Sequence, residues 1–152
     1  MKLKDFDFRV WDGSKYVNNI KGGVYIHKKD TDVKCLNRNQ ACYDYEFQLD
    51  DLDNSNLEIE LFTGLYDKNG NKIYEGDIVS YKTLQGKTLF YFITTNKMIN
   101  TFQIFLISDL ENFKLCNEIE IDRFLYSDFS KIEDMKNIEV IGNIHNKGDK
   151  II

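Results

Sequence analysis

The chain has 152 residues, of which 42% are hydrophobic, with 11 Phe, 9 Tyr and a formal net charge of −5. This length suits one modest domain, and the apolar content excludes an intrinsically disordered chain. The sequence contains no run of about 18 apolar residues, which excludes a membrane-spanning helix. We therefore predict a single domain over residues 1–152, without membrane association.

The first residues of the chain and its cysteines bear on its cellular location. Residues 1–9 alternate charged and apolar side chains and lack the apolar centre of a signal peptide. Cys35, Cys42 and Cys116 form a sparse, odd set, which is typical of a reduced intracellular protein. Both observations predict a cytoplasmic protein.

A first strand is predicted around Trp11, the only tryptophan of the chain. Side chains alternate between the two faces of a strand, so Phe8 and Val10 share one face while Arg9 and Trp11 share the other. Each face then carries a bulky group. We predict that Trp11 is buried, because large aromatic side chains dominate protein cores.

Residues 28–55 are mostly polar, and we assign no conformation to them. From Asn39 to Asp67 the chain carries eight Asp or Glu residues and no Lys or Arg. An acidic surface of this kind steers toward a basic partner surface, although solubility explains it equally well.

The segment from Leu61 to Val79 combines short β-prone runs with two turn signals. Asp67-Lys68-Asn69-Gly70 is typical of a tight hairpin turn, in which Asp caps the backbone and Asn-Gly accepts a positive φ. Glu75-Gly76-Asp77 predicts a second turn, after which β-branched residues resume an extended chain. We predict antiparallel strands on both sides of each turn.

Two more strands are predicted at Thr88–Thr95 and Thr101–Ser108, joined by a polar connector. One short helix is predicted over Ser127–Met135, with Ser127 as its N-cap. The predicted fold class is therefore mainly β: a compact antiparallel barrel-like or sandwich domain with short hairpins and one short helix.

Three segments together resemble the YopX family of phage and prophage proteins: Phe8 to Asp12, Thr63 to Val79, and Glu139 to Ile144. The tail departs from the family pattern, because His145 follows where the family usually carries an aromatic residue and a proline. The resemblance implies a β-rich fold, a mobile-element origin and no established activity. We interpret the positions that match the family pattern as structural; they are Phe8, Arg9, Trp11, Asp12, Thr63, Gly64, Asp67, Asn69, Gly70, Ile73, Tyr74, Glu75, Gly76, Asp77, Ile141, Gly142 and Asn143.

Neither a metal site nor a cofactor site is predicted. Asp51-x-Asp53-x-Ser55 and Asp67-x-Asn69-x-Asn71 begin like calcium loops. They have Asn56 and Lys72 at the sixth position, where such a loop requires Gly. The cysteines, together with His27 and His145, show no zinc-ligand spacing.

Catalysis is also not predicted. No Gly-x-Ser-x-Gly elbow or Gly-rich phosphate loop is present. The pairs Glu58 with Glu60 and Glu75 with Asp77 are no more than a chain with 25 acidic residues would contain by chance. We predict that the protein is not an enzyme.

The leading hypothesis is a phage- or prophage-encoded accessory protein that recognises a host or phage protein without catalysis. The alternative is a small-ligand protein, itself a possible homo-oligomer, that binds or sequesters a nucleotide or metabolite in an aromatic and basic cleft. A further alternative is single-stranded nucleic-acid binding by aromatic stacking. The densest basic group, Lys2, Lys4 and Arg9, is small, and a chain of charge −5 repels duplex DNA, which we do not expect as a partner.

Overall fold

The computed structural model describes residues 2–17, 24–38, 49–51, 56–96, 101–116 and 136–146. Strands and two short 3-10 helices make up its regular structure; in chain order they are η1 (Leu3–Asp5), β1 (Phe8–Trp11), β2 (Val24–Lys29), β3 (Asp32–Arg38), β4 (Leu49–Asp51), β5 (Glu58–Tyr66), β6 (Lys72–Tyr74), β7 (Asp77–Lys82), β8 (Thr88–Asn96), β9 (Thr101–Asp109), β10 (Lys114–Leu115), β11 (Ile138–Asn143) and η5 (Ile144–Asn146).

The prediction of a mainly β, antiparallel fold is confirmed. The described strands form three sheets, with the orders β1-β5-β6, β10-β9-β8-β7-β11 and β2-β3-β4. None of these orders closes into a ring, so the described part of the chain contains no closed barrel. The helix predicted over Ser127–Met135 lies outside the described residues.

The chain divides into two compact units, and the boundary falls within β5. Unit 1 comprises Met1–Asp7 and Leu61–Ile152, and unit 2 comprises Phe8–Glu60. A single domain over the whole chain stays a prediction. Each unit is described by itself below.

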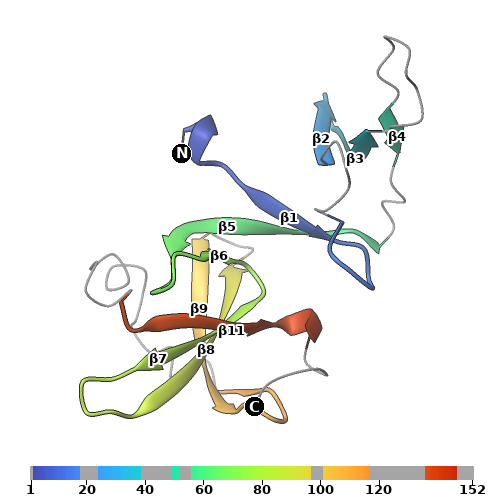
Figure 1. Cartoon of the computed structure of the whole chain (residues 1–152). Coiled ribbons are helices and arrows are strands. Elements are labelled where there is room, and N and C mark those ends of the chain that lie inside the picture. The colour runs from blue at the N-terminus through green and yellow to red at the C-terminus, as the bar shows by residue number, and fades with distance from the viewer. Residues whose placement is uncertain are drawn as a thin grey trace. The chain divides into compact units, whose positions relative to one another are not determined.

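Unit 1 is built on the five-stranded sheet, whose strands β7, β8, β9 and β11 are labelled in Figure 1. Strands β7, β8 and β9 are neighbours both along the chain and in the sheet, as the alternation of β-prone runs and turn signals predicted, whereas β11 pairs with β7 from much later in the chain. Its core is a cluster of buried aliphatic and aromatic side chains, namely Ile73, Val79, Tyr91, Ile93 and Ile138.

Unit 2 contains the antiparallel sheet β2-β3-β4, of which β3 and β4 fall within residues 28–55, the stretch to which no conformation was assigned. Its core brings together Val10, Val17 and Cys35. The predicted strand at Trp11 is observed as β1, and Trp11 is buried, with 9% of its surface exposed. The prediction for Trp11 is therefore confirmed.

In the part of the chain that the structure describes, no helix combines the length and apolar character that crossing a membrane requires.

Candidate functional site

The Asp67 turn is held by one carboxylate. Asp67 is buried, and its Oδ1 accepts hydrogen bonds from the N–H groups of Asn69 and Asn71, both at 2.8 Å. Its Oδ2 accepts from the Asn71 side chain at 3.1 Å and from the Val140 N–H at 3.2 Å. Burial by itself raises the pKa of Asp67, but these hydrogen bonds outweigh it and hold the pKa below the ordinary value. All of these partners are donors, so this carboxylate stabilises the turn and its contact with β11.

The predicted backbone of the same turn is confirmed. Gly70 has a φ of +82° and donates its N–H to the carbonyl of Asp67 at 3.0 Å. Asp67 caps the turn between the antiparallel strands β5 and β6, as predicted.

Asp77 makes a second buried connection between distant motif segments. Only 1% of its surface is exposed, and its carboxylate accepts hydrogen bonds from the Tyr74 N–H at 2.8 Å and the Asn143 amide at 3.2 Å. Asn143 in turn accepts the N–H of His145 at 2.9 Å. The second turn of the central motif is thereby joined to the end of β11.

Thr63 and Gly64 form a bulge in β5. The register shifts between the pairs Phe62–Tyr74 and Tyr66–Lys72, so three residues of β5 lie opposite Ile73 alone. Gly64 has a φ of +85°, and the Thr63 hydroxyl donates to the Ile73 carbonyl at 2.8 Å. The Thr-Gly pair is therefore explained by the backbone of this bulge.

In unit 2 the first motif segment is organised by an ion pair between Arg9 and the buried Glu60. Tyr16 donates its hydroxyl to Glu60 at 3.0 Å, and the Arg9 guanidinium lies 4.7 Å from the Tyr16 ring centroid. Trp11 meets the Tyr16 ring edge-on, with centroids 5.1 Å apart.

Asp12 closes the adjacent turn. It accepts hydrogen bonds from Lys15 and Ser14, which lower its pKa. In unit 2, therefore, Arg9 and Trp11 both contact Tyr16, and Asp12 supports the turn that leads to it.

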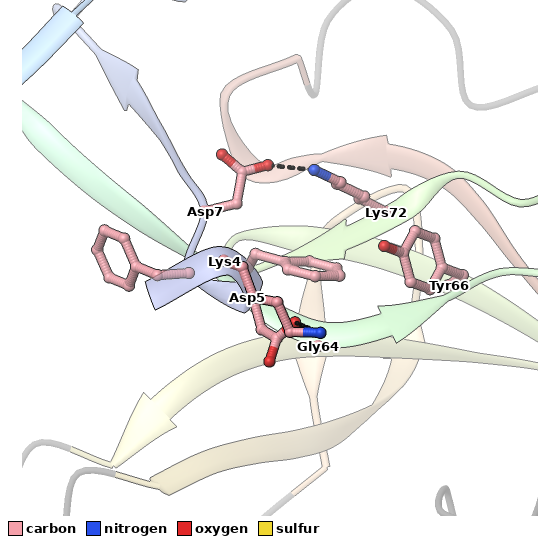
Figure 2. A pocket seen from close by; sticks show the side chains of 8 residues that line it. Lys4, Asp5, Asp7, Gly64, Tyr66 and Lys72 are labelled. Atoms are coloured by element: carbon pink, nitrogen blue, oxygen red, sulfur yellow. Dashed lines mark hydrogen bonds and ion pairs between the residues drawn. The ribbon is translucent and has the colours of Figure 1, made fainter. Parts of the chain in front are cut away.

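A different part of unit 1 forms an open pocket of about 460 Å³. From the sequence, only Lys4 of its lining was considered for binding, as part of the basic group, and only Gly64 matches the family motif; the lining residues are Lys4, Asp5, Phe6, Asp7, Phe62, Gly64, Tyr66 and Lys72. Figure 2 shows Asp7 and Lys72 facing each other, with the Tyr66 ring beside Lys72.

Aromatic rings and one polar bridge define the chemistry of this pocket. The Phe62 ring lies 5.3 Å from that of Tyr66 and 5.6 Å from that of Tyr74. Lys72 Nζ is 2.6 Å from Asp7 Oδ2 and 5.3 Å from the Phe62 centroid. The hydrogen bond to Asp7 raises the pKa of Lys72, and the Tyr74 hydroxyl donates to the same Asp7 oxygen at 2.7 Å.

The remaining catalytic and metal-binding candidates from the sequence do not come together in a site within the described residues. Glu75 accepts the Thr95 hydroxyl at 2.6 Å, and Cys35 is buried without a disulfide. Cys42 and the stretch from Leu52 to Ser55, which holds most of the first calcium-like motif, lie outside the described residues. Among the residues that are described, no group of three or more His, Cys, Asp or Glu side chains is placed to hold a metal ion.

Comparisons with known proteins add a family match. The profile of a family described as YopX protein matches residues 7–151. Among solved structures, the chain is similar to the crystal structure of protein EF1440 from Enterococcus faecalis, with 22% sequence identity, a TM-score of 0.49, and coverage of 92% of this chain and 93% of that chain. No curated protein matches the chain.

Proposed function

The chain belongs to the YopX family, and on this premise we propose that it acts by non-catalytic recognition of a protein partner through the pocket of unit 1. The observation that carries the proposal is the exposed apolar surface at this pocket. Phe6 and Tyr66 line it with 41% and 49% of their surfaces exposed, and Leu3 on η1 is 88% exposed. Clustered exposed apolar side chains mark interaction sites.

The engagement of the acidic residues supports a role without catalysis. Glu60 pairs with Arg9, Asp77 binds the Tyr74 N–H, and Glu75 binds Thr95. A general acid or base must reach a substrate, whereas these carboxylates bind their own chain. We further propose that the protein is encoded by a phage or prophage and meets its partner in the cytoplasm of the host cell.

Native mass spectrometry of the protein purified from host cells tests this function. We expect a mass increment that corresponds to a polypeptide. The double variant Phe6→Ser, Tyr66→Ser should lose the increment, because it removes two exposed rings from the pocket. The matched control is Leu84→Ser, since Leu84 is 99% exposed at the turn between β7 and β8. An increment that survives the double variant contradicts the proposal.

A small ligand is the second candidate, and the volume of the pocket favours it. A cavity of about 460 Å³ lies within the range of roughly 300–1,000 Å³ that is common for small-molecule sites. Aromatic rings beside Lys4 and Lys72 would suit a planar anionic compound such as a nucleotide. An increment of a few hundred daltons in the same spectra would favour this function over protein recognition.

A further inference from the structure

Lys72 shows what kind of group the pocket accepts. Its ammonium contacts the Asp7 carboxylate at 2.6 Å and faces the Phe62 ring at 5.3 Å from the centroid. A carboxylate beside an aromatic face is the combination that binds ammonium and guanidinium groups in proteins. One side chain of the protein therefore already occupies a cation site.

This internal cation can be displaced. The Lys72 and Asp7 side chains are 41% and 35% exposed, and ion pairs at such exposed positions contribute little to stability. The pocket also has room for another side chain. No atom lies within 4 Å of where a Cβ on Gly64 would stand, so the lining at Gly64 is open.

Charge favours a basic occupant. The other two charged residues of the lining, Lys4 and Asp5, lie 3.9 Å apart and offset each other. When Lys72 swings out, the Asp7 carboxylate gives up one cationic partner and keeps the hydrogen bond from the Tyr74 hydroxyl, so it can accept a cation in the place of Lys72. The chain as a whole carries a net charge of −5, which attracts basic molecules at long range.

We propose that the pocket binds a lysine or arginine side chain of the partner protein, which replaces Lys72 on the Asp7 carboxylate and the Phe62 ring. This inference rests on the proposed function and specifies the chemistry of the partner. It assigns to Lys72 the role of an internal competitor.

Calorimetric titration with blocked hexalysine, hexaarginine and hexaglutamate peptides tests the inference. We expect the two basic peptides to bind and the acidic peptide not to bind. Lys72→Met should tighten the binding of the basic peptides by about five-fold, because it removes the competitor. Asp7→Asn should weaken it by at least the same factor, with circular dichroism used to confirm that the variant is folded.

Lys68→Met is a matched control for Lys72→Met. Lys68 has the same 41% exposure and pairs with Glu139 at 2.6 Å, but it does not line the pocket. Both variants remove one positive charge, so only a site at the pocket makes them differ. Equal affinities for the two variants, or binding of hexaglutamate, would overturn the inference.

Tyr66→Ala supplies a second variant in case Asp7→Asn does not fold. The inference requires weaker binding of the basic peptides by Tyr66→Ala, and unchanged binding would count against it.

The failure of protein recognition and the failure of the basic-residue inference give different results. A polypeptide that co-purifies with the protein in the absence of any peptide binding overturns the basic-residue inference alone. A small-molecule increment in the native spectra overturns protein recognition itself.

Discussion

At Gly70 the backbone conformation restricts which residue types can be tolerated. Its φ of +82° lies in the left-handed region, and no atom lies within 4 Å of the position that a Cβ would take. A substitution at this position therefore lowers stability through backbone strain and not through a clash with neighbouring atoms. Because a β-branched residue is strained in this region, the side chain of valine should be poorly tolerated.

We expect Gly70→Val to lower the free energy of unfolding by about 1 kcal/mol or more. Gly142→Ala is the matched control, since Gly142 also has open space around it and no positive φ. Urea unfolding of both variants measures the difference. Equal stabilities would show that Gly70 does not need the left-handed conformation.

Asp67 makes the stability of unit 1 sensitive to acid. Its pKa in the folded protein lies below the ordinary value of 3.8, so the charged form stabilises the fold above that pH. This contribution is lost as the pH falls through the folded pKa. We expect the wild type to be more stable than Asp67→Asn at pH 7, and the gap to narrow below about pH 3.8.

Urea unfolding at pH 7 and pH 3 measures that gap. Glu139 needs a separate control, because its ion pair with Lys68 also lowers its pKa. The variant Glu139→Gln isolates that effect. If the stability gap between wild type and Asp67→Asn is the same at both pH values, Asp67 does not carry the linkage.

At the scale of elements, turn chemistry explains which strands could be predicted. Asp67-Lys68-Asn69-Gly70 and Glu75-Gly76-Asp77 have strong local signals, and the strands beside them, β5 to β7, were anticipated. β2 and β3 meet at Asp30 and Thr31 instead. Asp30 has a φ of +53°, which Asp tolerates, but this pair of residues gives a weak signal in the sequence.

The pocket could not be predicted, because nothing in its local sequence marks it. Phe62, Tyr66 and Lys72 look like ordinary strand residues, and Asp7 lies 65 positions from Lys72 along the chain. The bulge at Gly64 and the pairing of β5 with β6 bring Phe62, Tyr66 and Lys72 together, and the hydrogen bond from the Phe62 N–H to the Asp7 carbonyl places Asp7 beside them. These tertiary contacts leave no mark in the local sequence.

Trp11 on β1 provides a test at this scale. Because 9% of its surface is exposed and the Tyr16 ring packs against it, we expect iodide to quench its fluorescence weakly in the native protein. Urea-unfolded protein serves as the reference for full access. Native quenching as strong as in the unfolded chain would place Trp11 at the surface, as a binding residue.

At the scale of the whole molecule, two of the acidic residues between Asn39 and Asp67 do not contribute to an acidic surface. Glu60 is buried and pairs with Arg9. Asp67 is buried and accepts hydrogen bonds from the backbone of its own turn. Arg9, a member of the predicted basic group, has its charge paired with Glu60. The basic group is thereby reduced to the two lysines near the N-terminus.

We expect no measurable association with duplex DNA at physiological salt, because binding requires several clustered cations that release counterions. Fluorescence anisotropy of labelled duplex and single-stranded oligonucleotides over a range of ionic strength checks this. Tight binding with a log–log salt slope of several units would reveal a basic surface and would rank nucleic acid above protein as the partner.

Site-specific photo-crosslinking in the host cell tests protein recognition at the pocket most directly. A photoreactive phenylalanine analogue is placed at Tyr66 in one variant and at Leu84 in another, since both side chains are exposed but only Tyr66 lines the pocket. We predict a discrete polypeptide adduct at position 66 and none at position 84. Equal adducts at both positions, or no polypeptide at position 66, would contradict the account.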